Sequence, residues 1–316
     1  MFDPGGGVIV ACSGGPDSIC LLHALVRLRR LFRMELACFH FDHGLRQASR
    51  REAAYVRGQA ERLEIPFYER RAESKPGRGE SVEAWARTVR YGALLELADE
   101  LGAVAATGHT ADDQAETVLL ALLRGGGLEA LTGMSPEARP IVRPLLETTR
   151  EETEAFCRAL RLRPRRDPMN KDPSYMRVAI RTRVIPHVER ALGRGVRSTV
   201  VRSAELLRAD AELLDGLARE AARAIVSAQD REVLLRAADL RKLPPAIAGR
   251  VARGALLDLG MVPDASHVEA VVSLASGRVG RRVSLPNGLR ARRDREYVRL
   301  SRPSPGTRSS ARPPAR

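Results

Sequence analysis

The sequence predicts an α/β protein, with a parallel-sheet nucleotide-binding domain followed by a smaller, mostly helical second domain. Two patterns support this prediction. In the first half, short apolar runs alternate with longer amphipathic runs, which is typical of a parallel sheet covered by helices on both faces. Beyond about residue 144 this alternation ends, and long amphipathic runs with helical spacing dominate.

The first domain is expected over residues 1–198. Its apolar runs predict strands at 8–12, 36–41 and 103–107, and a further short strand that begins at 66–68. Its amphipathic runs predict helices at about 17–30, 49–63, 81–101, 111–123 and 151–160. Ser81 is a suitable N-cap for the third of these helices.

The second domain is expected over residues 199–300. Helices are predicted at about 199–225, 237–259 and 267–275. Residues 281–300 predict a β-hairpin with Pro286-Asn287-Gly288 as its turn. Residues 301–316 are rich in Pro, Ser and Arg, so a disordered tail is expected there.

The charge of the chain favours a polyanionic partner. There are 53 Lys plus Arg against 39 Asp plus Glu, which gives a net charge of +14 and a pI of about 10.7. Only three of the basic residues are Lys, and Arg is well suited to binding phosphate because its N–H groups donate in pairs. Nucleic acid and an anionic membrane surface both fit this charge. An Arg-rich solvated surface is the alternative.

The four cysteines, at positions 12, 20, 38 and 157, form no Cys-x-x-Cys pair. Three of them lie in apolar runs, where small buried thiols are common. We therefore expect no zinc site, iron–sulfur cluster or disulfide framework. The sequence has no signal-peptide pattern and no apolar run of 18 residues, so we expect a cytoplasmic protein with no membrane contact.

A polar segment with two glycines separates the first predicted strand from the next helix. Nucleotide phosphates bind at this position in α/β sheets, because glycines let the backbone approach and the helix N-terminus is partly positive. The hydroxyl groups of Ser13 and Ser18 can donate to phosphate, and the carboxylate of Asp17 can hold Mg²⁺. A glycine turn with a capping aspartate is the alternative. The candidate phosphate-binding residues are Ser13, Gly14, Gly15, Pro16, Asp17 and Ser18.

This segment, Ser-Gly-Gly-Pro-Asp-Ser, resembles the pyrophosphate-binding loop (PP loop) of the N-type ATP pyrophosphatases. The resemblance implies an enzyme that cuts ATP between its α- and β-phosphates, transfers AMP to an oxygen atom and releases pyrophosphate. The segment lacks the lysine of a Walker loop, which argues against simple cleavage of the γ-phosphate. The superfamily includes small-molecule synthetases and tRNA-modifying enzymes, so the loop leaves the substrate open.

Two further segments resemble motifs of the tRNA(Ile)-lysidine synthetases. His-Phe-Asp-His-Gly-Leu-Arg, at 40–46, ends the second predicted strand, where His43 and Arg46 would face the ligand crevice. Glu-Ala-Trp-Ala-Arg-Thr-Val-Arg-Tyr, at 83–91, places Arg87 and Arg90 on one helix face. Capping of the sheet edge and ordinary surface ion pairs are the alternatives.

A third segment, at 106–117, reads Ala-Thr-Gly-His-Thr-Ala-Asp-Asp-Gln-Ala-Glu-Thr and resembles another motif of the same family. It follows the fourth predicted strand and should border the nucleotide crevice. His109 and Asp113 could converge on the reacting centre, with His109 handling a proton and Asp112 or Asp113 binding metal. Plain capping of the helix by its acidic start is the alternative.

Two weaker matches extend the resemblance over about residues 8–190. The first covers 123–146 and includes Arg143-Pro-Leu-Leu. The second covers 167–186, and its candidate substrate contacts are Asp167, Asn170 and Arg177. In that second segment Val178 stands where the family usually has Asn, and Met169 where it has Ser.

The resemblance implies a ligase that forms a carbon–nitrogen bond. Its substrates would be L-lysine, ATP and the wobble cytidine of the isoleucine tRNA with anticodon CAU. Cytosine O2 would attack the α-phosphate of ATP, and the lysine ε-amine would then attack C2 and expel AMP, giving lysidine. A carbonyl oxygen is a poor leaving group and AMP is a good one, which explains the need for ATP.

The resemblance also implies roles for individual residues, with ATP and Mg²⁺ as cofactors. The implied catalytic residues are Asp17, His109, Asp113 and Arg87. The implied substrate-binding residues are His43, Arg46, Arg90, Asp112, Asp167, Asn170 and Arg177. Asp17 and Asp112 are the implied metal ligands. A homodimer is left open.

Three other functions are weighed against this one. A small-molecule amidotransferase-type synthetase is disfavoured by the basic charge and by the lack of a glutaminase-like domain in the sequence. A tRNA thiolase of the same superfamily is disfavoured, because such enzymes generally use paired cysteines or a cluster. A non-catalytic RNA-binding module with a degenerate nucleotide fold is disfavoured by the intact residues in all three motifs. ATP–pyrophosphate exchange with and without tRNA separates an enzyme from such a module.

Overall fold

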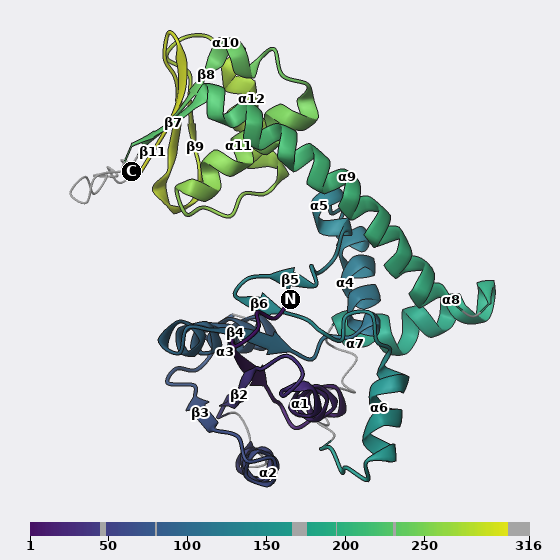
Figure 1. Cartoon of the computed structure of the whole chain (residues 1–316). Coiled ribbons are helices and arrows are strands. Elements are labelled where there is room, and N and C mark those ends of the chain that lie inside the picture. The colour runs from purple at the N-terminus through teal and green to yellow at the C-terminus, as the bar shows by residue number, and fades with distance from the viewer. Residues whose placement is uncertain (45–48, 80, 166–175, 194, 230–231, 303–316) are drawn as a thin grey trace, which may run out of the picture. The chain divides into compact units, whose positions relative to one another are not determined.

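The computed structural model describes residues 1–44, 49–79, 81–165, 176–193, 195–229 and 232–302 (Figure 1). It contains two compact units, Met1–Leu207 and Arg208–Arg316. The division falls within one helix, α9 (Val196–Ile225). The predicted tail lies outside the described residues except for its first two. No described helix combines the length and apolar composition needed to cross a membrane.

The first unit is built on a six-stranded sheet with the order β3-β2-β1-β4-β6-β5. The pairs from β3 to β6 are parallel, and β5 pairs with β6 in the antiparallel direction. The strands are β1 (Gly7–Ala11), β2 (Glu35–Asp42), β3 (Phe67–Arg71), β4 (Ala103–Thr107), β5 (Glu137–Ala138) and β6 (Ile141–Val142). This confirms the predicted α/β class and its parallel sheet.

Helices cover both faces of this sheet. Val8 and Val10 of β1 pack with α1 and α2 in one apolar cluster, whereas Ile9 packs with α3 on the opposite face. Because both faces are buried, the strands read as continuous apolar runs and not as alternating ones. The helices are α1 (Pro16–Leu28), α2 (Ser49–Arg62), α3 (Val82–Glu100), α4 (Ala111–Leu123) and α6 (Arg150–Ala159).

The ends of these helices follow from their caps. Ser81 accepts a hydrogen bond from the Ala84 N–H at the start of α3, as predicted. Thr110 and Asp113 form a capping box that starts α4. Elements that the periodicity did not predict are short, namely α5 (Leu128–Leu131), α7 (Met176–Ala179), a π-helical turn (Ile180–Val184) and α8 (Ile185–Leu192).

The strand order places the ends of β1 and β4 side by side. β1 pairs with β2 on one side and with β4 on the other. The strands that follow β1 in sequence therefore first add to one side of it, and β4 is then added on the other side. In open parallel sheets this switch point is where the loops diverge and a ligand crevice forms. The crevice is therefore bordered by the segments that follow Ala11 and Thr107.

The second unit contains a five-stranded antiparallel sheet with the order β7-β8-β11-β10-β9. Its strands are β7 (Val226–Gln229), β8 (Glu232–Arg236), β9 (Arg282–Ser284), β10 (Arg290–Arg293) and β11 (Tyr297–Ser301). The predicted hairpin is present as β9 and β10, joined at Pro286–Gly288, and β11 extends it. β7 and β8 were not predicted, because the chain passes from the helix before them to the helix after them without a Gly or Pro that would signal a turn.

The apolar cluster on this sheet includes Ala218 and Ile225 of α9 and residues of three further helices. These three helices are α10 (Ala237–Leu240), α11 (Pro245–Asp258) and α12 (Ala265–Ala275). The single helix predicted at 237–259 is therefore two. It is interrupted before Pro244 and Pro245, because proline lacks the N–H that helix continuation needs. α12 confirms the helix predicted at 267–275.

Candidate active site

The segment after β1 forms a tight loop that leads into α1. Gly14 has a φ of +85°, a conformation that a side chain would strain. Gly15 is the N-cap of α1 and has no side chain, so it cannot accept from the first N–H groups of the helix. These N–H groups and the helix dipole make this end of α1 suited to bind phosphate.

The two serines of the loop, Ser13 and Ser18, form hydrogen bonds within the loop and stabilise its conformation. Ser18 Oγ accepts from the Ser13 N–H, lies 3.2 Å from Ser13 Oγ and donates to the Gly15 carbonyl at 3.0 Å. Their hydroxyl groups were predicted to donate to phosphate, and that role stays a prediction. The loop is also tied from outside, because the Arg165 N–H donates to the Gly14 carbonyl at 2.8 Å.

Gly108, which follows β4, packs directly against this loop. A Cβ placed on Gly108 would lie 3.1 Å from the carbonyl carbon and oxygen of Asp17 and from the Ser18 nitrogen. Such contacts are tighter than nine in ten real Cβ contacts, and the neighbouring atoms here are backbone. The glycine of the third motif is therefore explained by this approach of backbone to backbone, which brings His109 to the edge of the phosphate loop.

Replacing Gly108 by alanine should displace the phosphate loop. We expect ATP affinity to fall at least about tenfold and the free energy of unfolding to fall by about 1–3 kcal/mol, because the Cβ overpacks against rigid backbone. Isothermal titration with ATP and thermal unfolding measure the two effects. Gly58→Ala in α2 is the matched control, since its Cβ would meet nothing within 4 Å. Equal ATP affinity in the two variants would contradict this account.

One arginine links the phosphate loop to the acids of α4. The guanidinium of Arg150, the first residue of α6, lies 3.5 Å from Asp17, 3.0 Å from Asp113 and 3.6 Å from Glu116. Its backbone N–H donates to Asp112 at 2.8 Å. α6 packs against α1, and Thr153 on α6 donates to Asp17 at 2.5 Å. The sequence analysis did not identify Arg150.

The pKa values of Asp17 and Asp113 shift in opposite directions because their surroundings differ. Burial raises the pKa of Asp17, and the hydrogen bond from Thr153 and the charge of Arg150 offset only part of this rise. Burial would also raise the pKa of Asp113, but Arg150 and the hydrogen bonds from Thr110 outweigh it and lower the pKa. Asp113 is therefore the more firmly ionised of the two.

Glu116 is a buried acid in the segment at 106–117, and no role was predicted for it. It is 3% exposed. Its Oε1 accepts no hydrogen bond among the described residues and lies 3.6 Å from Arg150 and 4.0 Å from Arg181. Burial, with the nearby charge of Asp113, raises its pKa to about 7. A carboxyl group with this pKa can accept a proton at physiological pH.

His109 lies beside this acidic cluster. Its Nδ1 is 2.9 Å from Thr107 Oγ1. Burial lowers its pKa to about 4, with a contribution from Arg143, and the attraction of Asp113 only partly opposes the shift. The imidazole is therefore neutral at pH 7 and can donate and accept hydrogen bonds without carrying charge.

Arg87 and Arg90 lie on α3 as predicted and share one aromatic partner. Their guanidinium carbons are 4.9 and 5.5 Å from the centre of the Tyr91 ring. The charges of both arginines help lower the pKa of His109, which places them near it. Arg177, also predicted, donates to Thr117 on α4 at 2.5 Å. The structure therefore brings Arg87 and Arg90 of one motif near the histidine of another, and joins Arg177 to the helix that follows this histidine.

Of the other predicted residues, two are described by the structure and three are not. His43, at the end of β2, contacts the rings of Phe41 and Trp85, with centroid distances of 5.0 and 6.3 Å. Asp112 already has a protein donor on each oxygen, the Arg150 N–H and the Arg197 guanidinium. Arg46, Asp167 and Asn170 lie outside the described residues.

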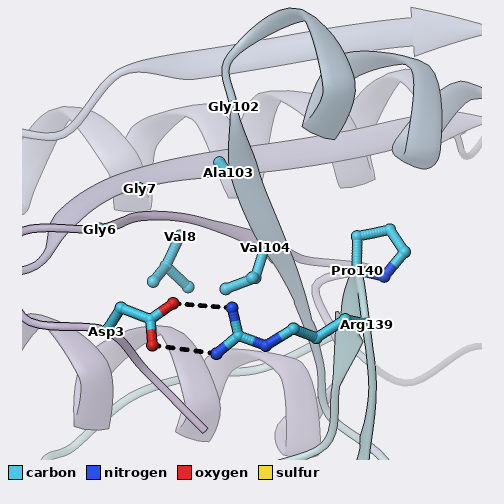
Figure 2. Close-up of a pocket in the computed structure, with 9 residues that line it drawn as sticks. All are labelled: Asp3, Gly6, Gly7, Val8, Gly102, Ala103, Val104, Arg139 and Pro140. Atoms are coloured by element: carbon cyan, nitrogen blue, oxygen red, sulfur yellow. Dashed lines mark hydrogen bonds and ion pairs between the residues drawn. The ribbon is translucent and has the colours of Figure 1, made fainter.

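A separate hollow of about 250 Å³ lies at the amino ends of β1 and β4 (Figure 2). It is lined by the start of both strands and by Arg139, which pairs with Asp3 at 2.7 and 3.1 Å. Asp3 and Arg139 are both largely exposed. The hollow is at the end of the strands opposite to the phosphate loop, so we do not assign it to the active site.

The acids of the crevice fit a magnesium ion only in part. Within the described ranges, no three His, Cys, Asp or Glu side chains are grouped so as to hold a metal by themselves. Mg²⁺ commonly takes one or two carboxylates and completes its shell with phosphate oxygens and water. Asp17, on the first turn of α1, fits that pattern, because one of its oxygens has only a 3.5 Å contact.

Comparison with known proteins agrees with this geometry. Residues 3–188 match the model of the PP-loop domain, and residues 235–299 match the TilS substrate binding domain. The tRNA(Ile)-lysidine synthase of Salinispora tropica is 41% identical over 92% of this chain and 89% of its own length. That of Salinispora arenicola is 40% identical over 95% and 92%, and that of Streptomyces coelicolor 38% over 90% and 82%.

A solved structure, the U34-tRNA thiolase NcsA from Methanococcus maripaludis with its [4Fe-4S] cluster, shares the fold. Its TM-score is 0.55 at 18% identity, over 66% of this chain and 74% of that one. The fold and the loop after β1 define a PP-loop enzyme, and a PP-loop domain implies ATP. Both domains of the chain are similar to those of the tRNA(Ile)-lysidine synthases, which identifies the family within this class of enzymes. The chain belongs to the tRNA(Ile)-lysidine synthase family.

Proposed function

We infer that the chain joins L-lysine to C2 of the wobble cytidine of the isoleucine tRNA with anticodon CAU. In this reaction ATP activates cytosine O2 by adenylation, and the lysine ε-amine displaces AMP. The observation that carries the proposal is the meeting of the phosphate loop with Asp113, Glu116 and His109 at one switch point of the sheet. That arrangement sets a phosphate site next to groups able to move protons.

The phosphate loop would bind the leaving pyrophosphate. The N-terminus of α1 and the loop amides concentrate donors where negative charge develops, which is where such a site gains most. Asp17 would hold Mg²⁺ beside the phosphates, and the ion would neutralise their charge. Asp112 was also predicted as a metal ligand, but both of its oxygens already accept from protein donors. We therefore propose Asp17 as the main protein ligand of Mg²⁺.

The acids of α4 would receive the lysine amine. An ammonium group cannot attack, so the ε-amine must lose a proton before it reaches C2. Glu116 has a pKa of about 7 and a buried oxygen without a hydrogen bond in the described part of the chain, so it is the strongest candidate for the base. The negative charge of Asp113 would stabilise the positive charge of the lysine amine. Neutral His109 would donate a hydrogen bond to the cytosine. Arg87 and Arg90 would contact the cytosine or its phosphate.

Incubation of the protein with labelled lysine, ATP and total bacterial tRNA tests this function. Digestion to nucleosides should yield labelled lysidine only when ATP is present. A labelled product other than lysidine, or none, would refute the proposal. ATP–pyrophosphate exchange with and without tRNA distinguishes a non-catalytic RNA-binding module, and incorporation of sulfur would indicate a thiolase.

The second unit has a basic sheet face suited to the tRNA backbone. Arg292 on β10 lies opposite Arg282 on β9 and Arg299 on β11. Like charges directly opposite each other destabilise a sheet, so a polyanionic partner gives a reason for this row. Asp294 and Glu232 neutralise only part of it, through Arg292 and Arg299.

Removing charge from this row should weaken the salt dependence of tRNA binding. Each phosphate contact contributes about 0.7–0.9 to the slope of log affinity against log salt. In the double variant Arg282→Gln/Arg292→Gln we therefore expect the slope to fall by roughly 1.5, measured by filter binding at several salt concentrations. Arg219→Gln/Arg223→Gln, two exposed arginines of α9, is the control. An equal fall in the control would assign the effect to net charge.

Two further parts of the proposal concern the setting of the reaction. We place the protein in the cytoplasm, where its tRNA substrate and lysine are found. A homodimer stays a prediction, and light scattering on the purified protein at several concentrations tests it.

A further inference from the structure

Arg143 is a buried arginine that no role above uses. It follows β6 and is 8% exposed. Its guanidinium donates to the Ser135 carbonyl at 2.7 Å and lies beside Tyr91. Its Nε is buried and has no hydrogen-bond partner among the described residues. Because a guanidinium stays charged in proteins, burying one without an acid is unfavourable unless an anion joins it.

Two further guanidiniums lie over the same tyrosine, and a third lies near one of them. Arg87 and Arg90 lie over its ring, and the charge of Arg177 acts on Arg90. In the part of the chain that the structure describes, no ion pair joins these three or Arg143 to a carboxylate. By contrast, Arg150 in the same unit contacts three acids. Arg87, Arg90 and Arg143 therefore gather near His109 without an ion pair to a carboxylate among the described residues. Arg177 lies near Arg90 and also acts on Glu116.

We propose that Arg87, Arg90, Arg143 and Arg177 form a binding site for a phosphate that flanks the target cytidine in the RNA. The inference rests on the proposed function and identifies the RNA group that this cluster takes. Guanidinium groups match phosphate oxygens in pairs. The pyrophosphate of ATP is the other source of the same chemistry. It has its own site at residues 13–18, and the contacts of the four arginines, with Tyr91, Ser135 and Thr117, include none of those residues.

A phosphate held here would position the base. Arg87, Arg90 and Arg143 lie close enough to His109 to help keep its imidazole neutral. A nucleotide anchored by its phosphate beside His109 brings its base to the same edge of the sheet as the phosphate loop. Single-stranded RNA is usually recognised in this way, through an unstacked base with its backbone fixed alongside.

The test pairs a protein substitution with a chemical change in the RNA. The affinity of an anticodon stem–loop is measured by fluorescence anisotropy, with the phosphate 5′ or 3′ of the target cytidine replaced by a neutral methylphosphonate. The unsubstituted protein should lose roughly tenfold in affinity for at least one neutral linkage. Arg143→Gln should lose roughly tenfold on the native RNA and nothing more on that neutral RNA.

Two controls and a second variant complete the experiment. Arg30→Gln removes one exposed charge beyond the far end of α1 and should respond to the neutral linkage as the unsubstituted protein does. If Arg143→Gln does not fold by circular dichroism, Arg90→Gln takes its place in the same cycle. Inorganic pyrophosphate should bind the arginine variant and the unsubstituted protein equally.

Three outcomes would overturn the assignment. They are no response of the unsubstituted protein to either neutral linkage, an undiminished response in the arginine variant, and loss of pyrophosphate affinity in that variant with RNA affinity unchanged. Failure of the proposed function is seen separately, as absence of lysidine when the unsubstituted protein acts on native RNA.

Discussion

Asp17→Asn is expected to slow pyrophosphate release by about 10²–10³-fold while the protein stays folded. The substitution removes the negative charge next to the phosphate loop but keeps an oxygen that can accept from Thr153, its present donor. Pyrophosphate release in the presence of lysine and tRNA, followed over a range of Mg²⁺ concentrations, measures the effect. The Mg²⁺ requirement should rise together with the loss of rate.

Asp112→Asn serves as the matched control for this prediction. Asp112 accepts from the Arg150 N–H and from the Arg197 guanidinium, so its loss should lower the melting temperature more than it changes the Mg²⁺ requirement. If Asp112→Asn raises that requirement and Asp17→Asn does not, the assignment of the metal to Asp17 is wrong. A near-normal rate in Asp17→Asn would refute the metal role altogether.

Glu116→Gln is expected to lower kcat by about 10²–10⁴-fold, the usual contribution of a general base. The pKa of Glu116 is about 7, so the activity of the unsubstituted protein should rise with pH up to about 7 and then level off. The variant should lose this rise along with most of its rate. Glu96→Gln, an exposed position on α3, should keep both. A variant that retains the rise would show that another group is the base.

The same substitution should stabilise the fold above neutral pH. The pKa of Glu116 in the folded chain, about 7, lies above the ordinary value of 4.5. The folded chain therefore binds more protons than the unfolded chain between these pH values, and its free energy of unfolding falls as pH rises through this window. At pH 8 the charged Glu116 should cost on the order of 3 kcal/mol. Thermal unfolding of the variant at pH 5 and pH 8 measures it, and the gain should appear only at pH 8.

The order of strands and helices in the first unit followed from local sequence. β4 and α4 begin and end where the periodicity placed them, and α3 begins after its Ser81 cap. Short-range rules suffice there, because apolar spacing and capping are properties of neighbouring residues. The same reasoning failed for β7 and β8, since no Gly or Pro separates β7 from α9 before it or β8 from α10 after it.

The candidate site could be predicted only where its residues share a motif. Asp17, His109 and Asp113 lie in recognisable segments, and the structure brings them to one crevice. Arg150 was missed because it reaches Asp17 only when α6 packs on α1, across 133 positions of sequence. In the structure a capping box of Thr149 with Glu152 starts its helix, but nothing local shows what that helix start contacts.

The contact of Gly108 with the Asp17–Ser18 peptide has a mechanical consequence. Backbone touches backbone there, and His109 is the next residue along the chain, so no compliant side chain separates the nucleotide loop from the imidazole. We expect the loop and the imidazole to keep a fixed spacing, so the position of a bound phosphate also sets its distance from His109.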